Sequence, residues 1–272
     1  MKHWDFINFN LQDFIQQTIS TFETEREIEK LWKAPLVAVL PADHPLLPSL
    51  KKLVSKDHLL PEELLPDAKS IIVFFIPFDD QIVESNLKGE AASEEWARAY
   101  VTTNELLVFV NEKLEMFLYK NGFQVTKIMA THNFDENTLM SRWSHRHIAW
   151  AAGLGTFGIN NMLITKQGCC GRFSSLVTNV DIQKFGISGE ASSSTKNPSE
   201  KCLNKINGSC GICQKKCPAG AYNEPGYFDR HRCYEVCLKN AELWKSIGYV
   251  DVCGKCLVGL PCSTKEPWKL ET

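Results

Sequence analysis

The sequence has 272 residues, of which 44% are hydrophobic, so it is long enough for one domain of ordinary size and a small second unit. Lys and Arg number 30 against 32 Asp and Glu, which excludes a global basic field for holding nucleic acid by its phosphates. No long apolar run or signal-peptide pattern is present, so we expect a cytoplasmic protein with no membrane contact. In a reducing compartment, eleven cysteines favour metal binding or redox chemistry over disulfides.

Helical and strand patterns interleave as far as residue 182. The predicted helices lie at 1–33, as one or two segments, at 93–120 and at about 137–152. The predicted strands lie at 35–40, 70–78, 123–130, 161–165 and 174–182. We expect the last two strands to pair as a hairpin across a short Gly-rich segment. This order of elements predicts an α/β or α+β body.

The composition changes after the body. Residues 187–200 are rich in Ser and nearly devoid of apolar side chains, which predicts a linker or surface loop. The last 72 residues then contain nine of the eleven cysteines. The sequence therefore predicts a body at 1–186, a linker at 187–200 and a cysteine-rich domain at 201–272.

The cysteine spacing indicates iron–sulfur clusters. Cys210, Cys213 and Cys217 form a C-x2-C-x3-C-P run, which is typical of bacterial ferredoxins, where the cysteine before Pro ligates the other cluster. A structural zinc site with four thiolates is the alternative, but it would use fewer than half of these cysteines. The region also has a single histidine, His231, whereas zinc modules often mix His with Cys. We therefore predict two 4Fe-4S clusters.

The inventory of thiols allows two sets of four ligands. The first cysteine of the ferredoxin run would fall at Asn207, so we expect Cys202 to replace it. The predicted ligand sets are Cys202, Cys210, Cys213 and Cys262 for one cluster, and Cys217, Cys233, Cys253 and Cys256 for the other. Cys237 lies four residues after Cys233 and either replaces it or is a buried apolar thiol. For the adjacent pair Cys169 and Cys170 we expect a structural role.

Three glycines precede the predicted strand at 161–165. The spacing of Gly153, Gly155 and Gly158 matches the pattern G-x-G-x-x-G. However, a helical segment precedes them and a strand follows, which is the reverse of the order in a dinucleotide site. We therefore reject a Rossmann-type nucleotide site. Two interpretations stay open: a tight turn with several positive φ angles, or close approach of the backbone to a flat cofactor.

Several motifs together resemble a known family. "LLPDAKSIIVFFIPF", "SHRHIAWAAGLGTFGINNMLIT", "GRFSSLVTNV", "CGICQKKCPAGA", "RHRC" and "CGKC" occur in the order seen in epoxyqueuosine reductases, which share architecture with reductive dehalogenases. The resemblance covers roughly residues 60 to 262. It implies a nitroreductase-like α/β body that holds a base-off corrinoid, joined to a bacterial-ferredoxin-like domain with two 4Fe-4S clusters. The candidate cofactor-binding residues are Ser144, Gly153, Gly155, Gly158, Asn160 and Arg172, of which Asn160 and Arg172 either contact the cofactor or close the predicted hairpin.

The sequence departs from that family in two ways. The position of the family's catalytic Asp, counted back from Gly153, is Leu139, so Asp135, Glu136 or His145 would have to donate the proton. His145 is also compatible with a hydrogen-bonded packing role. The chain ends ten residues after Cys262, whereas the family carries C-terminal helical repeats that help to hold tRNA. The sequence therefore resembles a shorter branch, and a tRNA substrate is doubtful.

These observations support two main functional hypotheses. The first is an oxidoreductase that passes electrons from a donor such as a ferredoxin or flavodoxin, through two 4Fe-4S clusters, to a corrinoid (cobalamin) or another flat acceptor. It would reduce an unidentified small molecule. The second is a non-catalytic electron-transfer or adaptor protein that keeps the clusters without the corrinoid. A zinc-stabilised binding module is the third, less favoured hypothesis.

Overall fold

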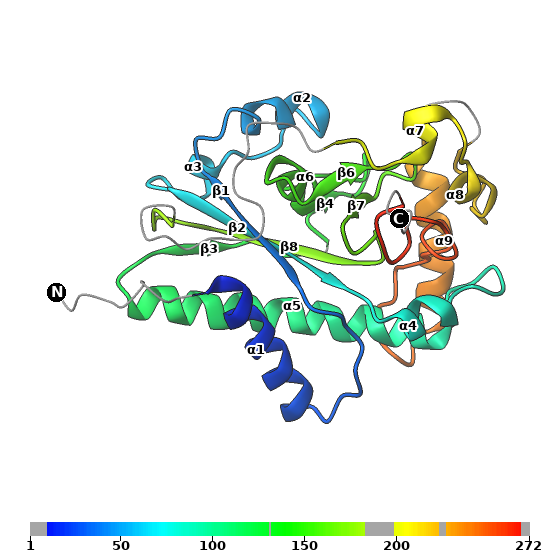
Figure 1. Ribbon diagram of the computed structural model, residues 1–272, viewed down its shortest axis with the longest axis horizontal. Coiled ribbons are helices and arrows are strands. Elements are labelled where there is room, and N and C mark those ends of the chain that lie inside the picture. Colours follow the sequence, from blue (N-terminus) through cyan, green and yellow to red (C-terminus); the bar gives the residue numbers. More distant parts are fainter. Residues whose placement is uncertain (1–9, 131, 183–198, 223–226, 268–272) are drawn as a thin grey trace, which may run out of the picture.

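A four-stranded antiparallel sheet forms the centre of the body in the computed structural model, which describes residues 10–130, 132–182, 199–222 and 227–267 (Figure 1). The strand order is β1-β2-β8-β3. The strands are β1 (Leu36–Pro41), β2 (Ser70–Pro77), β8 (Gly171–Thr178) and β3 (Val125–Lys127). Every residue of β2 is buried, because helices or loops cover both faces of the sheet, and this explains the apolar run that follows Ser70.

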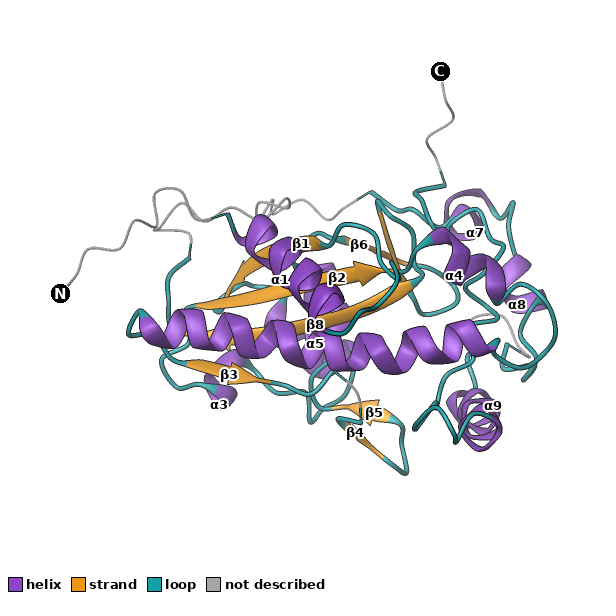
Figure 2. Cartoon of the chain, turned by 90° about the horizontal axis from the view of Figure 1, so that it is seen from below, coloured by secondary structure: helices purple, strands orange, loops and turns teal. Residues whose placement is uncertain are grey.

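Two helices cover one face of this sheet (Figure 2). They are α1 (Leu11–Glu25) and the 27-residue α5 (Glu94–Lys120). The hydroxyl group of Ser93 accepts a hydrogen bond from the backbone N–H of Trp96 and caps the start of α5. The helix ends at Asn121 and Gly122, as the sequence predicts, and the apolar side chains of both helices join the larger core.

Short elements cover the opposite face. They are the 3-10 helix η2 (Leu47–Ser49), α2 (Leu50–Leu53), α3 (Pro61–Leu64) and α6 (His145–Ala151). A second apolar core lies beneath them and includes Trp143, whose indole Nε1 donates to the hydroxyl group of Ser175 on β8 at 3.0 Å. The helix α4 (Asp80–Ser85) follows β2 and contacts α5.

Several predicted elements differ from the structure in pairing or extent; the strand at 123–130, for example, shortens to β3. The predicted helix at 137–152 shortens to α6, and the residues before it form the hairpin of β4 (Phe134–Asp135) and β5 (Met140–Ser141). The predicted hairpin of 161–165 with 174–182 is absent from the described residues. Instead, β7 (Leu163–Thr165) pairs with β6 (Gly155–Phe157), while β8 pairs with β2 and β3.

Gly155 allows the unexpected pairing of β6 with β7. A Cβ atom at Gly155 would lie 2.2 Å from the carbonyl oxygen of Ile164, so no other residue fits there without moving the backbone. The φ angle of Gly153 is +80°, but neither Gly155 nor Gly158 adopts a positive φ. In this segment only Gly153 and Asn161, with a φ of +58°, adopt positive φ angles, so the expected turn is met in part and close packing explains the later two glycines.

The cysteine-rich segment packs against one end of the body (Figure 1). Its helices are α7 (Leu203–Asn207), α8 (Ile212–Lys215) and α9 (Arg230–Leu243). The backbone N–H of Cys169 donates to the carbonyl oxygen of Cys262, and the buried ammonium group of Lys255 donates to the carbonyl oxygens of Asn86 and Lys88 at 2.9 and 2.7 Å. The predicted linker at 187–200 lies outside the described residues except for its last two positions.

The architecture is therefore α+β, within the class that the sequence predicts. In the part of the chain that the structure describes, no helix has the length and apolar character needed to cross a bilayer.

Candidate functional site

A large cavity lies between the body and the cysteine-rich segment. Its volume is about 930 Å³, at the upper end of the range for small-molecule sites. Its walls come from the β4–β5 hairpin, from α6, from the loop between β6 and β7, and from α9 with the loop that follows it. A ligand here would therefore touch both parts of the chain.

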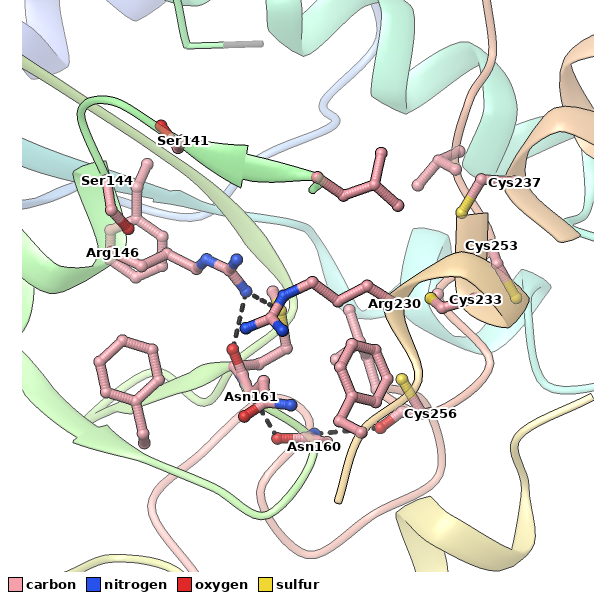
Figure 3. Close-up of a pocket in the computed structure, with 18 of the residues that line it drawn as sticks. Ser141, Ser144, Arg146, Asn160, Asn161, Arg230, Cys233, Cys237, Cys253 and Cys256 are labelled. Carbon is pink, nitrogen blue, oxygen red and sulfur yellow. Dashed lines mark hydrogen bonds between the residues drawn. The ribbon is translucent and has the colours of Figure 1, made fainter. Parts of the chain in front are cut away.

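One group of thiols lines this cavity. Its members are Cys217, Cys233, Cys237, Cys253 and Cys256. Figure 3 shows the side chains of Cys233 and Cys237 from α9 on the same side as those of Cys253 and Cys256. Four of the five are the second predicted ligand set.

The other predicted set surrounds a separate, small hollow. Cys202, Cys210, Cys213 and Cys262 all line it. The structure thus divides the eight predicted ligands into the two groups that the sequence suggests, although their binding of clusters stays a prediction. Among the described residues no three or more His, Cys, Asp or Glu side chains converge closely enough to hold a single metal ion.

The loop between Cys253 and Cys256 is fixed by its two central residues. Gly254 has a φ of +75°, and a Cβ atom there would lie 2.4 Å from the indole ring of Trp96 on α5. Lys255 reaches in the other direction, to the backbone after α4. The two thiols are therefore held on the framework of the body.

Burial disfavours ionisation of at least three of these thiols, Cys213, Cys253 and Cys256, by raising their pKa. Burial raises the pKa of Cys213 to about 12 and that of Cys253 to about 11, with further contributions from neighbouring thiols. Cys233 is the exception, because a hydrogen bond from Cys237 and the charge of Arg146 lower its pKa against the opposing effect of burial. Binding as thiolates therefore needs a metal group to displace the protons.

Two buried donors beside the second thiol group lack partners. The indole Nε1 of Trp96 and the hydroxyl group of Tyr222 have no hydrogen-bond partner of satisfactory geometry, and both side chains line the cavity. The hydroxyl group of Tyr222 lies beside the thiol of Cys256. Hydrogen bonds to cluster sulfurs are a recognised feature of iron–sulfur sites, so these donors fit a sulfur-rich group held by the thiols.

Both ring nitrogens of the predicted catalytic residue His145 are already engaged. Nε2 donates to the carbonyl oxygen of Met129 at 3.0 Å, because a carbonyl oxygen can only accept. In the neutral ring Nδ1 is then the acceptor, and it accepts from the hydroxyl group of Ser175 at 2.7 Å, which itself accepts from the indole of Trp143. Burial lowers the pKa of His145 to about 4, so it is neutral at physiological pH. This geometry is that of a packing histidine.

The other predicted catalytic residue, Asp135, lies outside the cavity lining. Its carboxylate accepts hydrogen bonds from the backbone N–H and hydroxyl group of Thr138, and these bonds lower its pKa. Leu139, at the position of the family's catalytic Asp, does line the cavity and has a φ of +54°. An apolar side chain therefore occupies the place where an acid was to be expected from the family.

The predicted cofactor-binding residues divide into two sets. Ser144, Asn160 and Arg172 line the large cavity, whereas Gly153 and Gly155 do not. The amide of Asn160 is engaged at both of its polar atoms, because Nδ2 donates to the carbonyl oxygen of Cys256 at 3.1 Å and Oδ1 accepts from the N–H of Met162. It ties the turn after β6 to the cysteine-rich segment.

The side chains of Ser144 and Arg172 also interact with other residues of the protein. The hydroxyl group of Ser144 is hydrogen-bonded to Nδ1 of His147 at 2.7 Å. The guanidinium group of Arg172 stacks on the ring of Tyr100, 4.4 Å from its centroid. Gly158 lines the small hollow of the first thiol group rather than the large cavity.

Sequence reasoning missed two arginines of the cavity. Arg146 stands between His145 and His147 on α6, and Arg230 opens α9 in the "RHRC" motif. Figure 3 shows their guanidinium groups pointing toward one another near Asn160 and Asn161. The only signal in the sequence was the position of each beside residues already singled out.

Comparisons with solved structures identify the fold. An epoxyqueuosine reductase from Streptococcus thermophilus matches with a TM-score of 0.53 at 16% identity, over 94% of this chain and 66% of that one. An epoxyqueuosine reductase bound to an epoxyqueuosine-modified tRNA-Tyr stem loop matches with a TM-score of 0.52 at 20% identity, over 93% and 66%. A catabolic reductive dehalogenase in complex with 3-bromo-4-hydroxybenzoic acid matches with a TM-score of 0.54 at 13% identity, over 85% and 30%.

The sequence matches no family model and no curated protein. The chain spans about two thirds of the length of these epoxyqueuosine reductases and less than a third of the dehalogenase. The resemblance that the sequence motifs suggest is nevertheless confirmed at the level of structure: this chain has the fold shared by epoxyqueuosine reductases and reductive dehalogenases.

Proposed function

We propose that this protein is an iron–sulfur reductase that delivers electrons from two 4Fe-4S clusters to an acceptor in the large cavity. The observation that carries the proposal is the grouping of nine thiols, four around the small hollow and five on the large cavity, which is enough for two sets of four ligands. The shared fold with two kinds of reductase supports the same reaction class. In this proposal residues 201–272 form a ferredoxin-like domain on a nitroreductase-like body of residues 1–186.

Each part of the chain has a defined task in this proposal. The first thiol group, which includes Cys202 and Cys262, would hold the cluster that receives electrons from a ferredoxin or flavodoxin. The second group, which includes Cys233 and Cys256, would hold the cluster beside the acceptor. Trp96 and Tyr222 would donate hydrogen bonds to sulfur there.

A corrinoid is the acceptor that the shared fold suggests, and when bound it would supply a metal able to reduce the substrate. The lining fits a large, partly apolar ligand, because Trp150, Phe157 and Met162 are among its apolar members. The chain's own contribution would be to orient that ligand, to keep water from it and to present it to the second thiol group. A small molecule is our proposed substrate.

A second candidate function is electron transfer without a catalytic step. Leu139 offers no proton to a substrate, and His145 uses both ring nitrogens inside the protein. This version keeps both clusters and treats the cavity as a docking place for a separate acceptor.

The metal content of anaerobically purified protein, prepared with cobalamin supplied, tests the proposal. We expect about eight irons and eight sulfides per chain, and about four of each in Cys213→Ser. Cys170→Ala is the matched control, because this buried thiol belongs to neither group and should leave the iron unchanged. One bound cobalt would support the reductase, iron without cobalt would favour electron transfer, and zinc without iron would overturn both.

A further inference from the structure

Two guanidinium groups in the cavity have no acidic partner among the described residues. Nη1 of Arg146 donates to the carbonyl oxygen of Asn161 at 2.7 Å and contacts the sulfur of Met162 at 3.0 Å, and both of these acceptors are neutral. Arg230 forms no ion pair or side-chain hydrogen bond with any residue that the structure describes. The two groups nevertheless point toward one another (Figure 3).

Among the described residues, the two acidic side chains that line the cavity, Asp251 and Glu200, interact with residues other than these arginines. Asp251 accepts a hydrogen bond from the hydroxyl group of Tyr100 at 2.6 Å and pairs with His132 at 3.1 Å. One oxygen of Glu200 accepts from the backbone N–H groups of Lys201 and Cys202. Neither carboxylate is within ion-pair distance of Arg146 or Arg230.

The other two cations of the lining are partly compensated. Arg172 stacks on Tyr100, whose hydroxyl group binds Asp251, and the ammonium group of Lys205 lies 3.8 Å from Glu200. The excess positive charge of the cavity is therefore concentrated where Arg146 and Arg230 meet.

We propose that Arg146 and Arg230 bind an oxyanion, either a carboxylate or a phosphate group, on the small molecule that occupies this cavity. A guanidinium group presents planar pairs of N–H donors that match both anions, and two opposed groups would hold one anion between them. The site would fix the substrate with its charged end at these arginines and its body against the second thiol group. This assignment rests on the proposed function only for its statement that a substrate enters this cavity.

A competing explanation is that the arginines merely balance the charge of a cluster. Cys233 lies close enough to Arg146 for their charges to interact, and a cluster with four thiolates is anionic. The two explanations predict different measurements. Charge balance alone would shift the cluster potential in an Arg230 variant and leave anion binding unchanged.

Titration calorimetry of the anaerobically purified protein, with inorganic phosphate and with benzoate as probes, separates them. We expect Arg230→Gln to weaken binding of at least one probe about tenfold or more, the loss of a charge-assisted hydrogen bond. Arg230→Lys should lose less. The control is Arg232→Gln on the same helix, because Arg232 pairs with Asp229 and does not line the cavity. The affinity of this variant for phosphate and benzoate should match that of the wild type.

Three results would overturn the assignment: no binding of either probe by the wild type, equal affinities in the wild type and Arg230→Gln, or an equal loss in Arg232→Gln. Repeating the titration with bound cobalamin tells the source of the anion. Phosphate binding that persists supports a substrate group, whereas phosphate binding that cobalamin abolishes would assign the arginines to the cofactor and refute a substrate site. Iron content measured on the same samples reports separately on the proposed reductase.

Discussion

Replacing Gly254 by Ala should destabilise the protein by more than its backbone conformation alone would cause. Gly254 lies between Cys253 and Cys256 with a φ of +75°, and a Cβ atom there would lie 2.4 Å from Cζ2 of Trp96. The ring cannot retreat, because Trp96 is only 1% exposed and packs edge-on against Phe78 with ring centroids 5.0 Å apart. The loop would therefore have to lift away from α5.

The expected magnitude has two parts. Placing an L-residue in the left-handed region costs about 1–2 kcal/mol. Overpacking against a fixed, buried side chain adds about 1–3 kcal/mol. The sum is about 2–5 kcal/mol for Gly254→Ala. Gly122→Ala is the matched control, since Gly122 has a φ of +81° and open space where the Cβ atom would lie, so only the first part applies.

The assay is anaerobic denaturant unfolding of both variants and the wild type, with iron content measured beside it. We expect Gly254→Ala to unfold at lower denaturant than Gly122→Ala and to retain less iron, because the lifted loop carries two of the thiols. Equal midpoints for the two variants would refute the argument that Trp96 forms a rigid wall under this loop.

Three further predictions concern the core and the thiols. Ser175→Ala should cost about 1–3 kcal/mol of unfolding free energy, because the indole N–H of the buried Trp143 loses its acceptor; denaturant unfolding at neutral pH measures it. By itself, His145 should lower the unfolding free energy by about 2 kcal/mol when the pH falls from 7.5 to 5, because its pKa is about 4 in the folded chain and about 6.5 when unfolded, so the unfolded chain takes up the proton first. His147, whose pKa is lowered to about 3, adds to this loss, so His145→Gln should reduce the pH dependence of the thermal midpoint without abolishing it; an unchanged pH dependence would contradict this. Cys233→Ser should lose about four irons while Cys237→Ala keeps them, because the hydrogen bond from Cys237 favours the thiolate of Cys233; the reverse result would make Cys237 the ligand.

Local patterns were sufficient for the elements whose signals lie within their own residues. The helix at 93–120 was predicted from its Ser93 cap and from Asn121 and Gly122 at its end, and α5 has these limits. The strands at 35–40 and 70–78 were visible as short apolar runs because both faces of the sheet are covered.

Pairing between strands was not predictable in the same way. The strand at 161–165 was expected to pair with the next strand along the chain, but it pairs with β6, where Gly155 lets the two backbones approach closely. The segment before α6 reads as helical in its composition, yet Leu139 adopts a left-handed conformation and the chain turns back as a hairpin. Both outcomes depend on contacts that no short window of sequence contains.

In the candidate site, too, some features could be predicted from local sequence and others depend on the folded chain. The two thiol groups were proposed from spacing, and each lines one hollow of the structure, while their binding of clusters stays a prediction. The convergence of Arg146 with Arg230 depends on how α9 packs against the body, so only the folded chain reveals it. The roles expected for His145 and Asp135 rested on their residue types, whereas their hydrogen bonds decide what each side chain is free to do.

The arrangement of the two thiol groups along the chain has a consequence for assembly. The members of the second group, from Cys217 to Cys256, all fall between Cys213 and Cys262 of the first. If both groups bind clusters as proposed, filling the inner group joins Cys217 to Cys256 and leaves only short connections to Cys213 and Cys262. The entropy of closing a loop grows with its length, so the inner cluster would lower the cost of forming the outer one. Maturation would then proceed from the cavity outward.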